Sequence, residues 1–258
     1  MSRIASVFRP GHKTFIAYLT VGYPSLETTY EAASVLADNG CDIIELGIPF
    51  SDPLADGATI QKASYQALQQ GVTPQTCLEA AQQLRQRVDV PLVFMSYYNP
   101  ILSYGLEAFC QASEKAGIDG IIVPDLPPEE GVELETSASK HKLDLIYLLT
   151  PTSTEERISL VAEKSRGFIY LVSLTGVTGA RQTLPLELED FVERVRQKAR
   201  QPLCVGFGVS NPEQAKRAAR AADGIIVGSR LIQLIEQDST LSSLKSFAFS
   251  LREALNSI

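Results

Sequence analysis

Eight short apolar segments alternate along the chain with longer segments in which hydrophobic residues recur every three to four positions. Most of the apolar segments are rich in Ile, Val, Leu, Phe and Tyr, which is typical of strands buried on both faces of a parallel sheet. They span residues 14–21, 41–47, 91–98, 118–124, 143–150, 167–173, 202–207 and 223–228. The alternation predicts eight β-strands, each followed by helix.

Capping residues mark where several of these helices begin and end. Thr73 precedes Pro74 and Asn211 precedes Pro212, so each pair places a capping side chain before a proline at the first helical position. Gly40 stands directly before the second apolar segment, where a glycine that ends a helix is common. These local signals support the helix boundaries that the hydrophobic pattern predicts.

The domain organisation follows from the same pattern. No linker, charge block or change in composition divides the sequence. Eight strand–helix units predict a single (β/α)8 TIM barrel over residues 1–258, in preference to an open doubly wound sheet. Residues 58–88 are long enough for an extra helix after the second strand, and residues 229–256 for one after the eighth. Active sites of such barrels lie on the loops that follow the strands, and candidate residues are sought there.

Composition and charge narrow the classes of function. Hydrophobic residues make up 45% of the 258 residues, and 23 Lys and Arg stand against 30 Asp and Glu, which gives a net charge of −7. An acidic chain disfavours a general binder of nucleic acid or of anionic membranes. The sequence has no apolar run of membrane-spanning length and no signal-peptide or transit-peptide pattern, so we expect a cytoplasmic protein.

The distribution of cysteine, histidine and lysine disfavours several chemistries. The four cysteines have no paired spacing, and the two histidines precede the first and fifth predicted strands, at the wrong end of the barrel for an active site. We therefore expect neither a disulfide framework nor a histidine-based metal site, although an all-carboxylate magnesium site stays open. No lysine follows the end of a predicted strand, which disfavours a Schiff-base aldolase.

Glu45 is a carboxylate inside an apolar segment. If residues 41–47 form a strand, Glu45 shares a face with Cys41 and Ile43. An ionised carboxylate buried without a partner is costly, so Glu45 should either pair with an arginine or with backbone amides, or have a raised pKa. We favour the second interpretation, in which Glu45 is a general acid and base at the barrel mouth.

The next loop adds two further carboxylates. Two prolines and a glycine exclude regular helix over residues 48–57. Asp52 precedes a proline and Asp56 precedes a glycine, and both dipeptides are also ordinary turn formers. We favour a catalytic role for Asp56 because the loop can fold its tip over the mouth. For Asp52, a turn former and a functional or interface residue are both open.

Three later loops are rich in glycine and follow the sixth, seventh and eighth predicted strands, at residues 175–181, 206–211 and 228–230. Glycine lets backbone amides approach an anion closely, and a helix N-terminus adds partial positive charge. Their convergence predicts a site for a sugar phosphate or similar anion. The sequence has no Walker motif and no complete dinucleotide fingerprint, so neither ATP nor NAD is expected.

Aromatic side chains lie near the same strand ends. Individually each is more typical of a hydrophobic core, but together they could line a pocket for a flat aromatic group. They are Tyr18, Tyr97, Tyr98, Tyr170 and Phe207.

The segment ELGIPFSDPLADG, from Glu45 to Gly57, resembles the signature of the tryptophan synthase alpha chain family. The segments GVTGA at residues 176–180 and GFGVS at residues 206–210 are similar to later loops of that family. The similarity extends over essentially the whole chain. One position departs from the pattern, because Ala58 stands where the family usually has proline, and this affects loop rigidity more than chemistry.

This resemblance implies cleavage of indole-3-glycerol phosphate to indole and glyceraldehyde 3-phosphate, with no cofactor and no metal in this chain. It implies that Glu45 is the general acid and base and that Asp56 is the second catalytic carboxylate. It also implies substrate-binding roles, either in the pocket or at the phosphate, for Tyr18, Tyr97, Tyr170, Thr178, Gly179, Phe207, Gly208, Gly228 and Ser229.

The resemblance further implies a partner, a beta chain that carries pyridoxal phosphate, in an α2β2 tetramer through which indole passes. As a hypothesis, Asp52, Pro53 and Asn99 contact that partner.

Three alternatives are open. A stand-alone indole-3-glycerol phosphate lyase would use the same catalytic residues. An isomerase or synthase acting on a related ribulose phosphate is disfavoured by the lack of a strand-end lysine. A non-catalytic regulatory barrel is disfavoured because both Glu45 and Asp56 are retained.

Overall fold

The strands form one parallel sheet that curls into a barrel. The computed structural model describes residues 2–172, 186–206 and 208–258. Hydrogen-bonded neighbours in the sheet follow the order β5-β4-β3-β2-β1-β9-β8-β7-β6, and every pair is parallel. The strands are β1 Thr14–Thr20, β2 Ile43–Gly47, β3 Leu92–Met95, β4 Gly120–Ile122, β5 Asp144–Ile146, β6 Leu148–Leu149, β7 Ile169–Val172, β8 Leu203–Gly206 and β9 Gly224–Val227. The (β/α)8 prediction is confirmed.

The predicted fifth strand, residues 143–150, differs from expectation because it is two short strands. β5 pairs with β4, whereas β6 pairs with β7, so this one segment joins the two ends of the sheet. Between them, the Tyr147 N–H donates to the Ser165 hydroxyl at 3.1 Å, and the Tyr147 carbonyl accepts from the Tyr170 N–H at 3.1 Å. The chain turns from one neighbouring strand to the other at Tyr147, which closes the barrel and interrupts the regular ladder.

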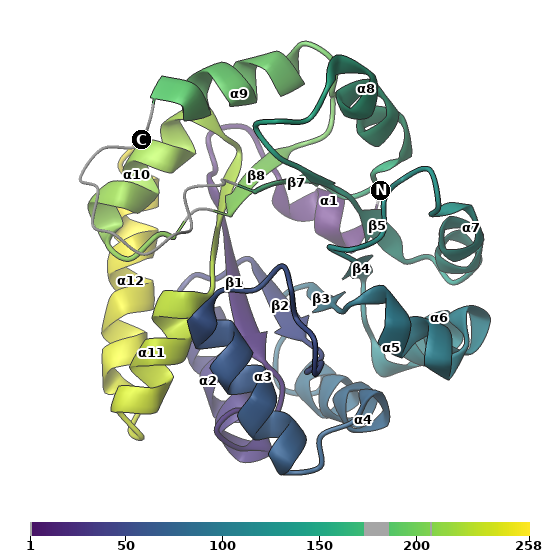
Figure 1. Ribbon diagram of the computed structural model, residues 1–258. Helices are drawn as coiled ribbons and strands as arrows, with labels where there is room; N and C mark the ends of the chain where they lie inside the picture. The colour runs from purple at the N-terminus through teal and green to yellow at the C-terminus, as the bar shows by residue number, and fades with distance from the viewer. Residues whose placement is uncertain (1, 173–185, 207) are drawn as a thin grey trace.

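Helices surround the sheet (Figure 1). Two helices follow β2 and two follow β9, as the lengths of residues 58–88 and 229–256 predict. The pair after β3 and the short helix before β1 are additional to those predictions. The helices are α1 Arg3–Val7, α2 Leu26–Asp38, α3 Ala58–Gln69, α4 Pro74–Arg85, α5 Tyr98–Tyr104, α6 Leu106–Ala116, α7 Val132–Lys140, α8 Glu155–Lys164, α9 Leu186–Arg196, α10 Pro212–Ala221, α11 Ser229–Gln237 and α12 Ser242–Asn256.

The predicted capping signals act at the expected helix ends. The Thr73 side chain accepts from the Thr76 N–H at 3.2 Å at the start of α4. The Asn211 side chain accepts from the Gln214 N–H at 2.9 Å at the start of α10. Gly40 follows α2 with a φ of +89°, in the left-handed region that favours glycine. These boundaries are set by local chemistry and are therefore readable from sequence.

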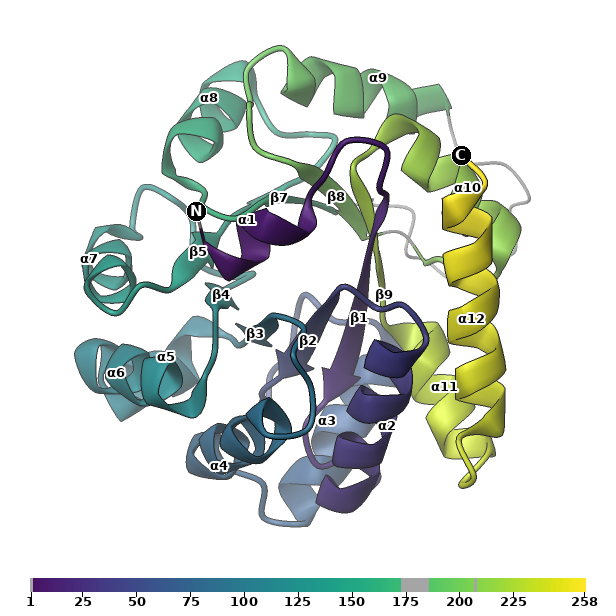
Figure 2. The ribbon, with the colours of Figure 1, turned by 180° about the vertical axis from the view of Figure 1, so that it is seen from behind.

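The N-terminal helix closes one end of the barrel. Ile4 of α1 is fully buried in one cluster with the strand residues Ile16, Ile43 and Val93 and with Phe168, which directly precedes β7. Figure 2 shows α1 lying across that end of the barrel. A larger hydrophobic layer packs between the strands and the surrounding helices. The end occupied by α1 is the end where strands begin, so the opposite end is open for a site.

Candidate active site

A cavity of about 330 Å³ lies at the ends of the strands, opposite α1. Residues of β1, β2, β7 and of the segments after β2, β8 and β9 line it, although these lie far apart in sequence. The cavity therefore occupies the position expected for a barrel active site. The predicted site residues that line it are Tyr18, Glu45, Asp56, Tyr170, Gly208, Gly228 and Ser229.

Glu45 is buried and has no partner among the described residues. It lies on β2, in register with Tyr18 of β1 and Val93 of β3, and its exposed fraction is 1%. Neither carboxylate oxygen makes a hydrogen bond there, so the alternative in which Glu45 is paired finds no support. Burial, and secondarily the charge of Asp56, raises the pKa of Glu45 to about 8. The expected raised pKa is confirmed.

The interior position of Glu45 follows from β2 itself. Ile43 belongs to the inward-facing cluster, and the alternation of a strand places Glu45 on the same side. Cys41, predicted to share this face, lies before β2 and packs in the layer between sheet and helices. That part of the prediction is wrong because the period of two holds only within the strand, which begins at Ile43.

Asp56 reaches the cavity because its loop folds back on itself. The Asp56 N–H donates to the Pro53 carbonyl at 3.0 Å, and the Ala55 N–H donates to the Tyr97 hydroxyl at 2.8 Å. The Gln61 side-chain amide donates to the Asp56 carbonyl at 2.9 Å. Burial raises the pKa of Asp56 to about 6, and a hydrogen-bond contribution from Tyr97 opposes the rise. Tyr97 thus supports the loop, and it does not line the cavity itself.

The two carboxyl groups have different protonation states near neutral pH. Glu45 and Asp56 line the same cavity, and the charge of Asp56 contributes to the raised pKa of Glu45. At pH 7, Glu45 is mostly protonated and Asp56 is mostly ionised. The site therefore combines a proton donor with a fixed negative charge, the division of roles that environment imposes on paired catalytic carboxylates.

Two tyrosines fill space that glycines leave free. A Cβ atom on Gly47 would lie 2.1 Å from the Tyr18 hydroxyl oxygen, and one on Gly206 would lie 2.5 Å from the Tyr170 hydroxyl oxygen. Both rings therefore lie directly over strand backbone, where a larger residue would displace them. Burial raises the pKa of both hydroxyls, so they are neutral at physiological pH. They supply a largely apolar wall with two polar tips.

The far end of the cavity offers backbone amides. Gly228 is the N-cap of α11 and Ser229 its first residue, and no side chain caps this terminus among the described residues. Gly208 is exposed beside them, with nothing within 4 Å of the position of a Cβ atom. Such an uncapped helix start attracts an anion. Thr178, Gly179 and Phe207, also predicted to bind substrate, lie outside the described residues.

Several lining residues escaped the sequence analysis. Met95, Ile60 and Leu148 add apolar surface, and Arg230 and Gln233 add polar groups near the start of α11. A signal existed only for Arg230, which directly follows the Gly-Ser pair of the last glycine-rich segment. The others lie in helices or strands whose facing direction the sequence does not reveal.

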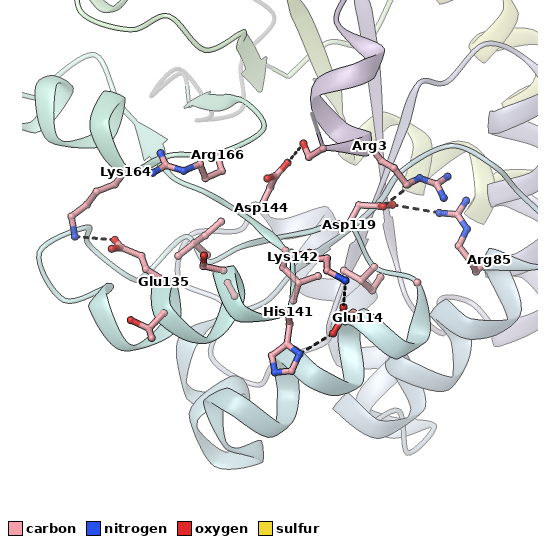
Figure 3. Close-up of a pocket in the computed structure, with 18 of the residues that line it drawn as sticks. Arg3, Arg85, Glu114, Asp119, Glu135, His141, Lys142, Asp144, Lys164 and Arg166 are labelled. Atoms are coloured by element: carbon pink, nitrogen blue, oxygen red, sulfur yellow. Dashed lines mark hydrogen bonds and ion pairs between the residues drawn. The ribbon is translucent and has the colours of Figure 1, made fainter.

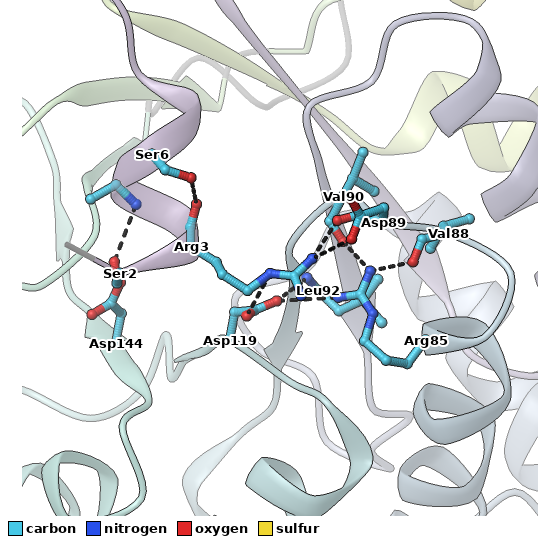
Figure 4. A network of polar contacts seen from close by, with 11 residues as sticks. Ser2, Arg3, Ser6, Arg85, Val88, Asp89, Val90, Leu92, Asp119 and Asp144 are labelled. Carbon is cyan, nitrogen blue, oxygen red and sulfur yellow. Dashed lines mark hydrogen bonds and ion pairs between the residues drawn. The ribbon is translucent and has the colours of Figure 1, made fainter.

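A larger cavity, of about 1140 Å³, lies near the starts of β4 and β5 and is not the active site (Figure 3). Its charged groups pair with one another, as in the 2.9 Å contacts of Lys164 with Glu135 and of His141 with Glu114. Arg3 and Arg85 both contact Asp119, which ties α1 and α4 to the barrel (Figure 4). The charged side chains of this cavity thus neutralise one another and hold neighbouring elements together, which is a structural role.

Both histidines lie at that end, as predicted. The imidazole of His12 is 2.8 Å from Asp42, and hydrogen bonds to Glu114 and Glu107 raise the pKa of His141. The described residues contain no group of three or more His, Cys, Asp or Glu placed to hold a metal ion. None of the helices in the described ranges is long and apolar enough to cross a membrane.

The residues assigned to a partner interface lie on the surface near the cavity. Asp52 and Asn99 are exposed and Pro53 is half-buried. Next to Pro53, Leu54 is 92% exposed, and Leu102 of α5 is 51% exposed. Exposed large apolar side chains next to a predicted contact region are a feature expected of a protein–protein interface.

Comparisons with a family model, with protein sequences and with solved structures all find similarity to the same family. The family model described as tryptophan synthase alpha chain matches residues 4–255. The tryptophan synthase alpha chain of Dehalococcoides mccartyi is 58% identical over 99% of this chain and 100% of its own length, and that of Chloroflexus aurantiacus is 48% identical over 100% and 99%. Tryptophan synthase subunit alpha from Legionella pneumophila, a crystal structure, is 36% identical with a TM-score of 0.91, covering 100% of both chains.

Proposed function

The chain belongs to the tryptophan synthase alpha chain family, and we propose that it catalyses the alpha reaction, the cleavage of indole-3-glycerol phosphate to indole and glyceraldehyde 3-phosphate. In class this is a carbon–carbon lyase reaction. The observation that carries the proposal is Glu45, a buried carboxyl group that has no partner among the described residues and shares a cavity at the strand ends with a second carboxylate. Burying a carboxyl group without a partner costs free energy, and such groups are found mainly at catalytic sites.

The first chemical step uses the proton that Glu45 holds at neutral pH. Glu45 donates this proton to C3 of the indole ring, which becomes a cation of iminium type. The ionised Asp56 stabilises that cation near the ring N–H. The substrate itself thus becomes the electron sink for breaking the carbon–carbon bond, and each well-placed acid or base contributes about 10²- to 10⁴-fold in rate.

The second step returns the proton to Glu45. The Glu45 carboxylate removes the proton of the hydroxyl on the carbon attached to C3, and the oxygen electrons form the aldehyde. The carbon–carbon bond breaks, and its electron pair restores the neutral indole ring. Glu45 ends the cycle protonated, as it began, so the reaction needs no other proton source.

The rest of the cavity supports binding of this substrate. Tyr18 and Tyr170 offer flat surfaces for the ring. The backbone amides at Gly208, Gly228 and Ser229 are suited to the phosphate. The predicted roles of Thr178, Gly179 and Phe207 are retained as proposals.

We also propose a beta chain as partner, with pyridoxal phosphate bound to that chain and an α2β2 assembly as the complete enzyme. The exposed Leu54 beside Asp52 and Pro53, and Leu102 close in sequence to Asn99, are the features that support such an interface. A cytoplasmic location, expected from the sequence, stays a prediction that cell fractionation would test.

The test is indole release from indole-3-glycerol phosphate by the purified chain, with and without a beta chain from the same source. We expect slow release by the chain alone and an increase of orders of magnitude when the partner is added. Fast release that is indifferent to the partner would instead identify a stand-alone lyase. No release under either condition would refute the enzyme assignment.

Glu45→Gln tests the mechanism in the same assay. The variant should lose nearly all turnover but keep substrate affinity, because the amide has similar shape and cannot exchange the proton. Glu31→Gln, the same change on the exposed surface of α2, is the matched control and should retain turnover. Normal turnover in Glu45→Gln would remove Glu45 from the mechanism.

A further inference from the structure

Arg230 is the only cationic side chain among the described residues that line the active-site cavity. It is the second residue of α11, directly after Ser229, and it is partly buried. The catalytic carboxyl groups of Glu45 and Asp56 also line this cavity. The cavity thus contains both negative and positive groups, and the positive one accompanies the uncapped start of α11.

The guanidinium of Arg230 has no anionic partner in the described structure. It makes no hydrogen bond or ion pair with any described residue. By contrast, Arg85 contacts a carboxylate and two backbone carbonyls, and Arg252 contacts a carboxylate and one backbone carbonyl. The contact it does make is with an aromatic face, since its Cζ lies 5.9 Å from the centre of the Phe247 ring. Phe247 belongs to α12, which packs against α11 and runs beside it (Figure 1).

This position is electrostatically unfavourable unless an anion is present. A cation in the first turn of a helix is repelled by the positive end of the helix dipole. At this terminus no described side chain supplies a negative group, because the cap residue is Gly228. An anion in the cavity would satisfy both the free amides of α11 and the five N–H donors of the guanidinium.

Resting on the proposed function, we propose that Arg230 is a specificity-determining residue that pairs with the phosphate of the substrate from the rim of the cavity. Backbone amides recognise the phosphate oxygens, whereas Arg230 adds a full positive charge, and the Phe247 ring limits where its side chain lies. Arg230 contributes to selection of phosphate esters over uncharged analogues, and it takes no part in bond cleavage.

The test compares Arg230→Gln and Arg230→Lys with the unchanged protein. Arg230→Gln should raise KM for indole-3-glycerol phosphate about 10- to 100-fold, the range expected for a charged hydrogen bond, and leave kcat within about twofold. Inhibition by glycerol 3-phosphate should weaken by the same factor, whereas binding of indole should be unchanged. Arg230→Lys should lie between the two, because lysine retains charge without the planar fork.

Two controls separate this inference from its alternatives. Arg9→Gln removes the same charge from an exposed position at the other end of the barrel and should leave KM unchanged. Calorimetric titration with glycerol 3-phosphate measures the contribution of Arg230 to phosphate-ester binding without any need for turnover. An inactive unchanged protein would therefore refute the proposed function but leave the inference about Arg230 open to this test. Phosphate-ester affinity in Arg230→Gln within twofold of the unchanged protein would refute the inference, as would an equal loss of indole affinity.

Discussion

Glu45, the proposed general acid and base, also affects the stability of the folded chain. A glutamate in an unfolded chain has a pKa of about 4.3. Burial raises the pKa of Glu45 to about 8 in the folded protein. Between these pH values the folded state holds a proton that the unfolded state has released. The contribution of Glu45 to the free energy of unfolding therefore becomes less favourable to the folded state as pH rises from about 4 to about 8.

Glu45→Gln should accordingly stabilise the protein while inactivating it. The free energy of unfolding, measured with urea at pH 8, should be larger for the variant than for the unchanged protein. The difference should shrink as pH is lowered toward 5, because the carboxyl group of the unchanged protein then approaches protonation in both states. A difference that is constant with pH would contradict the raised pKa of Glu45.

Asp56 affects both limbs of the expected pH profile of kcat/KM: its own protonation sets the acid limb, and its charge raises the pKa of Glu45, which sets the basic limb. Activity should fall below about pH 6, where Asp56 is protonated, and above about pH 8, where Glu45 loses its proton. These apparent values belong to the coupled pair. In Asp56→Asn the residual activity should lose its acid limb, and the basic limb should move to lower pH because the charge that raises the pKa of Glu45 is gone. A basic limb that does not move would show that the two groups are not coupled.

At the scale of elements, the loop between β2 and α3 places Asp56, a proposed catalytic residue, at the cavity. Its tip is held by Tyr97 and by Gln61 of the first turn of α3, so the position of Asp56 depends on where that helix begins. Ala58 is the first residue of α3. The preceding Gly57 has φ −77° and ψ 164°, an extended conformation that also suits a residue before proline.

Ala58→Pro should therefore stabilise the chain without altering the site. Proline is favoured at the first helical position, where the lost N–H has no intrahelical acceptor, and it restricts the unfolded chain. We expect a gain of about 0.4–1 kcal/mol in the free energy of unfolding, with kcat/KM within about twofold. Thermal unfolding and the indole-release assay measure the two effects. A lower melting temperature would show that the α3 start cannot accept proline.

At the scale of the whole molecule, the two ends of the barrel are built differently. The end closed by α1 is held by paired charges, such as Arg3 and Arg85 with Asp119. Among the described residues, the opposite end holds a buried carboxyl group without a partner, a guanidinium without an anionic partner, and exposed apolar side chains. β1 near the N-terminus pairs with β9 near the C-terminus, from which we infer that residues 1–258 fold as one domain.

The exposed apolar side chain of Leu54 leads to a prediction about assembly. If the face around Asp52 and Pro53 contacts the beta chain, Leu54→Ser should raise the Kd of the complex about tenfold or more, as expected when a buried leucine is lost. Phe249→Ser, on α12, removes another exposed apolar side chain and should leave Kd unchanged. Titration calorimetry would measure both. Equal effects of the two substitutions would argue against an interface at Leu54.

The sequence by itself determined most element positions and was enough to propose Glu45 and Asp56 as the catalytic pair. Strand and helix periods, the caps at Thr73 and Asn211, and a carboxylate inside an apolar strand are local features, because each depends on residues within one or two turns of chain. The same locality explains why Glu45 and Asp56 could be selected before any contact was known.

The tertiary structure alone decided what depends on distant segments meeting. It splits residues 143–150 into β5 and β6, because this segment must bond to β4 on one side and β7 on the other. It brings Ile4 of α1 into the barrel interior, and it leaves Arg230 unpaired among the described residues beside the cavity. Burial and the absence or presence of a partner are properties of three-dimensional packing, so no local pattern could have revealed them.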